Sequence, residues 1–127
     1  MSITSYLDLE VYRRSMSVLL GVHQMVRGFP DYEMRELGSQ MRRASKSIPL
    51  NIVEGYGRKR SEKDFKYYLS NAMGSANEMV VSLEIAKLLS YADVNDCDHL
   101  INEYNEIGKM LNGLIASWKN FSTVKAI

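Results

Sequence analysis

The side chains with the greatest potential for chemistry are few and widely spaced. The sequence contains two histidines, His23 and His99, and a single cysteine, Cys97. Neither histidine has Glu three residues before it, so the Glu-x-x-His pairs of a carboxylate-bridged metal bundle are absent. One cysteine cannot form a disulfide within one chain or a cysteine-based zinc cluster. The sequence therefore predicts no metal and no cofactor.

Two short segments resemble functional motifs without meeting their requirements. Residues 96–99 combine two acids, a cysteine and a histidine, which loosely suggests metal ligands. They lie at the expected start of a helix, however, where acids favour the positive end of the helix dipole. Residues 55–58 lack the Gly-Lys-Ser/Thr ending of a phosphate loop, and no strand precedes them. Because no nucleophile–base pair is recognisable either, we expect a protein that is not an enzyme.

Cations gather in one part of the chain although its formal net charge is only +1. Residues 42–66 contain eight cations and three acids, whereas residues 67–107 contain one cation and seven acids. Phosphate contacts of clustered cations produce sequence-independent nucleic-acid binding, and tyrosine rings can stack on unpaired bases. The candidate nucleic-acid-binding residues are Arg42, Lys46, Arg58, Lys59, Arg60, Lys63 and Lys66, with Tyr56, Tyr67 and Tyr68 as candidate stacking residues. The alternative interpretation is a loop whose charges are merely solvated.

A polar row follows the second predicted helix at spacings of three and four residues. Its members are Gln40, Arg43, Ser47, Asn51 and Glu54. A row of this kind is either a solvated face or a hydrogen-bonded network between helices or subunits. Arg43 and Glu54 are about 16 Å apart along a helix, too far for a direct pair. If the row is a network, each of these two residues requires a partner from another helix or subunit.

Four segments with a helical period must position these residues. Apolar residues recur at spacings of three and four over residues 8–27, 32–55, 62–89 and 94–120, and the last series reaches Phe121. The content of 46% hydrophobic and 24% charged residues is that of a globular protein. We therefore predict an all-α fold: one domain over residues 1–127, an antiparallel up-down four-helix bundle with a short C-terminal tail.

Local signals refine the expected helix ends. Asp8 is a candidate N-cap, and Ser61 with Asp64 resembles a capping box. Pro49 interrupts the second helix, and a kink is favoured over a break because the apolar face resumes in register. The glycines at 55 and 57 offer a left-handed cap.

The first and fourth helices each carry two neighbouring apolar stripes, which exceed what one small bundle buries. We therefore expect a homo-oligomer. No apolar run is long enough to cross a membrane and the first residues do not form a signal peptide, so a cytoplasmic location is expected.

Several segments resemble the family named for 23S rRNA intervening sequences. They are QMRRA at residues 40–44, SIPLNIVEGYGR at 47–58, LDLEVY at 7–12, Phe29-Pro30, Phe65, Gly74-Ser75-x-x-Glu78 and IGKMLNGLI at 107–115. The resemblance covers roughly residues 6 to 119, and its central motif is long and irregular. Met73 departs from it, because the family often carries Arg before the Gly-Ser pair.

The resemblance implies a four-helix bundle that assembles as a ring-forming homopentamer. Similar bundles in diversity-generating retroelements, called accessory variability determinants, bind nucleic acid and a reverse transcriptase. By analogy, RNA or DNA, and a reverse transcriptase or another protein, are candidate partners, although fold alone does not confer function. The leading hypothesis is thus a non-catalytic, nucleic-acid-associated homo-oligomer. The alternative is an oligomeric scaffold that binds only protein.

Overall fold

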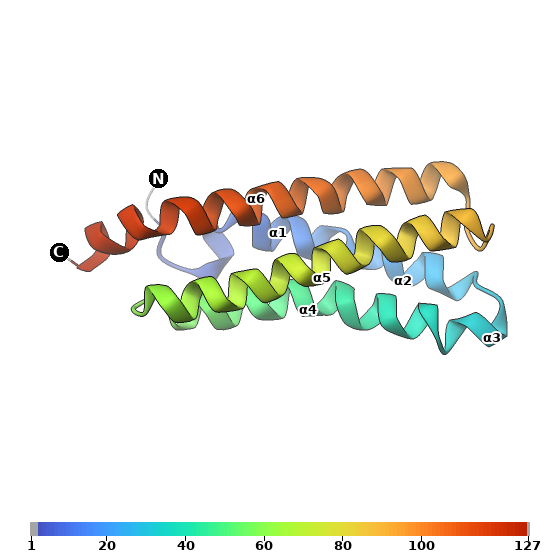
Figure 1. Cartoon of the computed structure of the whole chain (residues 1–127), viewed down its shortest axis with the longest axis horizontal. Helices are drawn as coiled ribbons and strands as arrows, with labels where there is room; N and C mark the ends of the chain where they lie inside the picture. The colour runs from blue at the N-terminus through green and yellow to red at the C-terminus, as the bar shows by residue number, and fades with distance from the viewer. Residues whose placement is uncertain (1–2, 127) are drawn as a thin grey trace.

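Apolar side chains at three- and four-residue spacing hold four helical arms together. The computed structural model describes residues 3–126, with side chains for residues 3–118. In Figure 1 the chain runs in opposite directions along successive arms, and no strand occurs among the described residues. The predicted all-α class is therefore confirmed. The elements are η1 (Tyr6–Asp8), α1 (Glu10–Ser17), α2 (Leu19–Arg27), α3 (Asp31–Met34), α4 (Leu37–Gly57), α5 (Glu62–Leu88) and α6 (Val94–Ala126).

The first arm is two helices rather than the continuous helix predicted over residues 8–27. A turn at Val18 separates α1 from α2. Just before it, the Ser15 hydroxyl donates to the Tyr12 carbonyl at 2.8 Å, and the Ser17 hydroxyl donates to the Arg14 carbonyl at 2.7 Å. Such bonds from serine to the preceding turn compete with regular helical bonding and bend helices. The apolar period alone carries no sign of this interruption.

Asp8 does not cap α1, contrary to the sequence-based expectation. The N-cap residue of α1 is Leu9, which has no side-chain bond there. The Asp8 carboxylate instead accepts bonds from the backbone N–H groups of Thr4, at 2.8 Å, and Ser5, at 3.1 Å. These bonds cap the short helix η1 and, with the Thr4 backbone bond as the main cause, lower the pKa of Asp8.

The second arm is α3 and α4, separated by a turn at residues 35–36, rather than the single helix predicted over residues 32–55. Within this arm, α4 continues through Pro49 without a break. The predicted left-handed glycine cap at its end is wrong, because no glycine of the described chain has a positive φ. Gly55 has a different role, since an added Cβ would lie 3.1 Å from the Cβ of Tyr68 and 3.3 Å from the Phe65 carbonyl oxygen. Its missing side chain lets α4 and α5 approach closely beside their connecting turn. After this turn α5 begins at its N-cap Ser61, whose hydroxyl accepts from the Asp64 backbone N–H at 3.2 Å.

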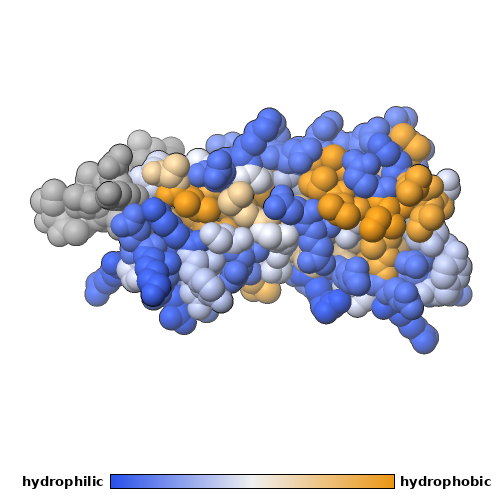
Figure 2. All heavy atoms as spheres, viewed as in Figure 1, coloured by the Kyte–Doolittle hydropathy of each residue, from blue (hydrophilic) through white to orange (hydrophobic). Residues whose placement is uncertain are grey.

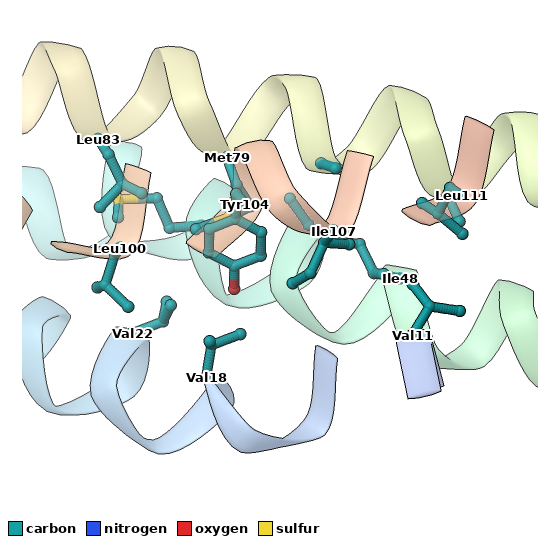
Figure 3. Close-up of a cluster of buried hydrophobic side chains, with 14 of the residues drawn as sticks. Val11, Val18, Val22, Ile48, Met79, Leu83, Leu100, Tyr104, Ile107 and Leu111 are labelled. Atoms are coloured by element: carbon teal, nitrogen blue, oxygen red, sulfur yellow. The ribbon is translucent and has the colours of Figure 1, made fainter. Parts of the chain in front are cut away.

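The core runs along the axis between the arms (Figure 3). In the first arm the inward stripe is Val11, Val18 and Val22, whereas Met16 of the neighbouring stripe is 44% exposed. Tyr104 of α6 is also buried, and its hydroxyl points toward the valines of the first arm (Figure 3). Burial raises the pKa of this phenol.

The fourth arm, α6, extends to Ala126, beyond the end expected near residue 120. The side chain of Phe121, predicted for its apolar face, lies outside the described residues.

Candidate nucleic-acid interface

The turn between α4 and α5 presents the densest group of cations at one end of the bundle. It is closed by backbone bonds from Arg58 N–H to the Gly55 carbonyl at 3.0 Å and from Ser61 N–H to the Arg58 carbonyl at 3.0 Å. A bond from Lys59 N–H to the carbonyl of Tyr56 adds a third contact at 3.2 Å. Because these bonds tie the turn to the end of α4, its three consecutive cations have a defined backbone position.

An aromatic cluster packs inside the bundle next to this turn. The rings of Phe65 and Trp118 stack with centroids 4.1 Å apart, and Tyr56 meets Trp118 edge-on at 6.5 Å. Tyr56 is only 8% exposed, so it cannot serve as the stacking platform for a base that the sequence suggested. Tyr67 is 60% exposed and remains available for this role. The cluster therefore supplies a buried, packed base for the turn, and the exposed Tyr67 ring lies nearby on α5.

Several of the loop cations already have partners within the chain. Arg58 is 3.4 Å from the Glu54 carboxylate and lies over the Tyr68 ring at 5.3 Å. The ammonium of Lys59 lies 4.1 Å from the centre of the Tyr56 ring. At the start of α5, Lys66 pairs with Glu62 at 2.9 Å. The side chains of Arg60 in the turn and Lys63 in α5 are exposed to solvent. Surface pairs of this kind are weak, so phosphate oxygens could compete for most of these cations.

The remaining two predicted cations lie apart from the loop. Lys46 precedes Arg58 by twelve residues, or about 18 Å along α4. Arg42 lies another turn away, and its guanidinium approaches the Met34 carbonyl oxygen at 3.4 Å. The predicted set thus divides into a loop group of five cations and a separate pair on the middle of α4.

The polar row of α4 also divides into two parts, a hydrogen-bonded network in its middle and separate residues toward its ends. The Ser75 hydroxyl of α5 donates to the Ser47 hydroxyl at 2.9 Å, and the Asn51 amide donates to the Ser47 carbonyl at 2.9 Å and hydroxyl at 3.0 Å. This is a network between helices, one of the two alternatives that the sequence left open. Glu54, in contrast, pairs with Arg58, the residue that follows its own helix. Gln40 and Arg43 are exposed.

The residues considered for metal or redox chemistry have structural surroundings. Cys97 is fully buried, and this burial raises the pKa of its thiol. Its neighbour Asp98 pairs with Lys87 at 2.8 Å, and the Nδ1 of His23 lies 2.9 Å from the Leu19 carbonyl oxygen. Within residues 3–118, no three His, Cys, Asp or Glu side chains gather where they could hold a metal ion.

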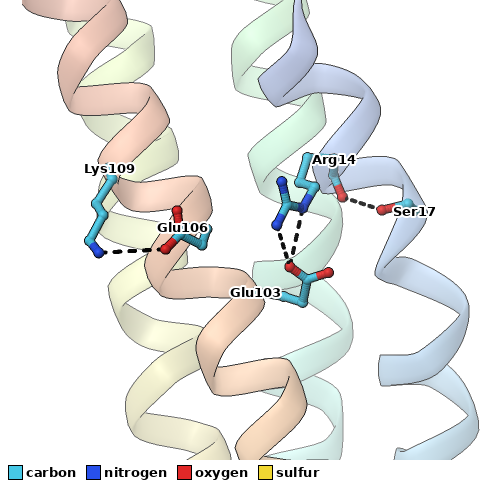
Figure 4. Close-up of polar contacts among 5 residues, drawn as sticks. All are labelled: Arg14, Ser17, Glu103, Glu106 and Lys109. Carbon is cyan, nitrogen blue, oxygen red and sulfur yellow. Dashed lines mark hydrogen bonds and ion pairs between the residues drawn. The ribbon is translucent and has the colours of Figure 1, made fainter.

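Contacts between arms include one pair that the sequence analysis did not identify. The guanidinium of Arg14 in α1 is 2.8 Å from the Glu103 carboxylate of α6 (Figure 4). The hydrogen bond to Glu103 raises the pKa of Arg14. Because the two residues are 89 positions apart, no local sequence pattern could have paired them.

A second feature absent from the sequence-based site is an apolar ridge on α5. Val81, Ile85 and Leu88 are 58%, 38% and 81% exposed. Figure 2 shows apolar surface gathered where α5 ends and α6 begins. The spacing of four and three residues was a visible signal, but helical periodicity does not say which stripe faces inward.

The family is decided by a match over residues 7–113 to the 23S rRNA-intervening sequence protein family. The chain belongs to this family. The quoted segments around residues 40–58 and 107–113 lie within the matched range, so the resemblance seen in the sequence is confirmed. Met73, the departure from the family pattern, packs partly buried against the core.

Among solved structures, the chain is similar to a protein of unknown function from the S23 ribosomal protein family of Bacteroides thetaiotaomicron. The TM-score is 0.72 at 24% identity, and the match covers 83% of this chain and 97% of the other. This likeness supports the fold. No curated protein matches the chain. No helix, as far as the chain is described, is long and apolar enough to cross a membrane.

Proposed function

We propose that this protein is a non-catalytic homo-oligomer that binds RNA or DNA through the turn between α4 and α5. The observation that carries the proposal is the loop group of cations, defined as Arg58, Lys59, Arg60, Lys63 and Lys66, which gathers at one end of the bundle. Its backbone is held by three hydrogen bonds and supported by buried aromatic rings. Membership in a family named for rRNA intervening sequences agrees with a nucleic-acid partner.

Assembly strengthens this proposal because one loop group makes few phosphate contacts. Each phosphate neutralised adds to affinity through counterion release, and linked copies of a site bind with an increased effective concentration. A ring of subunits repeats the loop group around its circumference. Five subunits, and a cytoplasmic setting, are the expectations from the family resemblance and the sequence.

The experiment is a polarisation titration of the full chain with a structured RNA hairpin and a DNA duplex at 50 and 200 mM salt. Wild type is expected to bind both weakly and to lose affinity as salt rises. The variant Arg58→Glu/Lys59→Glu/Arg60→Glu should lose most binding, and the slope of log affinity against log salt should fall by about one for each phosphate contact removed.

A matched control carries the same charge change elsewhere on the surface. Arg27→Glu/Arg35→Glu/Lys109→Glu reverses three exposed cations outside the loop group. This control should keep the wild-type salt slope, because its cations do not contact the phosphates. Equal losses in the two triple variants would mean that net charge rather than the loop matters. No binding by the folded wild-type oligomer at low salt would overturn the proposal.

The alternative, a scaffold that binds only protein, is favoured by one specific observation. Arg58, Lys59 and Lys66 already have partners within the chain, as cations of a solvated surface often do. A scaffold would form the same oligomer while the salt titration detected no nucleic-acid complex. The titration therefore separates the two functions without further variants.

A further inference from the structure

Two apolar surfaces of the bundle differ in shape and lie on different arms. The ridge, Val81, Ile85 and Leu88, stands on the outer face of α5. The other surface is a groove of about 500 Å³ between the first arm and α4, lined by Tyr12, Met16, Leu19, Lys46, Pro49, Leu50, Val53 and Glu54. In the bundle α5 packs against α4 and α6, while the first arm packs against α4 and α6 from the other side. The ridge and the groove therefore face outward in different directions.

The two surfaces match in length and in apolar character. The ridge extends over eight residues of helix, about 10 Å, and the α4 wall of the groove from Lys46 to Val53 has the same length. Leu50 in the groove is 68% exposed, and Leu88 on the ridge is 81% exposed. Leucines exposed to this extent are favourable to bury, because removing apolar surface from water stabilises an association.

The charges beside the two surfaces have opposite sign. Glu78 and Glu84 flank the ridge, within a segment of residues 67–107 that carries seven acids and one cation, Lys87, which lies 3.9 Å from Glu84. Arg43 and Lys46 precede Leu50 on α4, and Glu54, the one acid that lines the groove, is paired with Arg58 at 3.4 Å. Among the described residues, Arg43, Lys46 and Glu78 have no ion-pair partner. Pairing ridge with ridge would oppose acids with acids, whereas pairing ridge with groove opposes acids with cations.

A glycine on the ridge face of α5 leaves room for a helix of another copy to approach closely. Gly74 lies seven residues before Val81, so it occupies the same side of α5. It is exposed, and an added Cβ would meet nothing within 4 Å. Ala72 and Ala76, two residues to either side, are buried inside the chain. Gly74 itself leaves bare backbone on the outer face, where an approaching helix would meet no side chain.

We infer that the ridge of one copy docks into the groove of the next, a head-to-tail contact between identical chains. The inference rests on the self-association within the proposed function and specifies its interface. Because ridge and groove are different surfaces, after the first contact one copy still has a free groove and the other still has a free ridge. A head-to-tail contact of this kind closes into a ring where the rotation between copies permits it. It also assigns Lys46 and Arg43 to the interface and leaves the loop group for nucleic acid.

The test mixes two variants that each lose one half of the contact. Val81→Glu/Leu88→Glu removes the ridge and Met16→Glu/Leu50→Glu removes the groove, all at exposed positions that tolerate a charged residue in one chain. Alone, each variant should be monomeric by sedimentation velocity, with its helical circular dichroism unchanged. A 1:1 mixture should form a two-chain complex, because one intact ridge and one intact groove remain. Leu7→Glu, at another exposed leucine, is the matched control and should keep the wild-type assembly.

The outcomes separate this inference from the proposed function. Wild-type assembly in both variants, or two variants that stay monomeric when mixed, would overturn the ridge-to-groove contact while leaving nucleic-acid binding open. A wild type that is monomeric at micromolar concentration would overturn both the contact and the oligomer. An oligomer that forms as described but does not bind nucleic acid would leave the contact standing and favour the scaffold.

Discussion

The two ends of the bundle treat their apolar side chains differently. At the turn between α4 and α5, Phe65 and Trp118 are almost fully buried, and the exterior carries mainly cations. At the opposite end, where α5 passes into α6, Leu88, Leu89 and Val94 are each at least half exposed beside acidic residues. The end at the α4–α5 turn thus buries its apolar side chains within the chain and exposes charge. The opposite end exposes apolar surface. Charge suits a phosphate backbone, and apolar surface suits a protein.

The largest expected effect comes from removing the aromatic support of the basic end. Phe65 is fully buried and stacks on Trp118, so Phe65→Ala should lower the free energy of unfolding by about 3–5 kcal/mol. Urea unfolding followed by circular dichroism measures this loss. Tyr67→Ala, at an exposed ring on the same helix, should change stability by less than about 0.5 kcal/mol. Similar losses for both variants would show that the turn is not supported by its buried rings.

A smaller effect is expected midway between the ends, where the polar network joins α4 to α5. Ser75→Ala removes the donor to Ser47 and should cost about 1 kcal/mol, the net value of a partly buried hydrogen bond. Gln40→Ala, on the exposed part of the same polar row, should be neutral. The comparison uses the urea midpoints of the two variants. If Ser75→Ala leaves the urea midpoint unchanged, the polar row does not stabilise the fold and is an ordinary solvated surface.

At the end of the bundle where α5 passes into α6, one substitution should raise the free energy of unfolding rather than lower it. Ser90 follows α5 with a φ of 59°, a left-handed conformation that costs a non-glycine residue roughly 1–2 kcal/mol. Ser90→Gly should therefore raise the free energy of unfolding by about 0.5–1 kcal/mol. Thermal unfolding should show a higher midpoint. A lower midpoint would mean that the serine side chain stabilises this turn by more than the strain costs.

The smallest effect concerns pH and the N-terminal cap. Bonds from Thr4 and Ser5 lower the pKa of Asp8 below its usual value of 3.8, so the ionised carboxylate favours the folded chain. Its contribution is present above pH 3.8 and is lost as the pH falls through the lower, folded-state pKa. Asp8→Asn should be less stable than wild type at pH 7, and the difference should shrink in acid. Urea midpoints of both proteins, measured at pH 7 and in acid below the folded-state pKa of Asp8, test this expectation. A stability difference that does not change with pH would contradict it.

Helix content was predictable from this sequence, whereas the interruptions of the helices were not. The period of three and four residues identifies the arms because it reflects a one-sided burial that every arm shares. The turn at Val18 escaped prediction because serine hydroxyls bonding to the preceding turn leave the apolar pattern unchanged. The glycine at 55 was assigned to the wrong role for a similar reason. A glycine beside a turn signals a cap, but here the backbone of a neighbouring helix requires it.

The candidate site was predictable as a set of residue types but not as a geometry. Charge counting located the cations, since nothing else in the chain has their density. It could not separate Lys46 from the loop group, or reveal that Lys59 lies over the ring of Tyr56. Those facts depend on distances along α4 and on which tyrosine packs against Trp118. Neither is encoded in local spacing.

The sequence by itself determined that four amphipathic arms must pack together and that charge must separate along the chain. Only the tertiary structure decided which stripe of each arm became core. In the first arm both the Val18 stripe and the Met16 stripe satisfy the helical period, and the positions of α4 and α6 bury the valines and leave Met16 at a groove. On α5 the same packing leaves Leu88 outside. A helix with two apolar stripes can bury either one, so its neighbours in space make the choice.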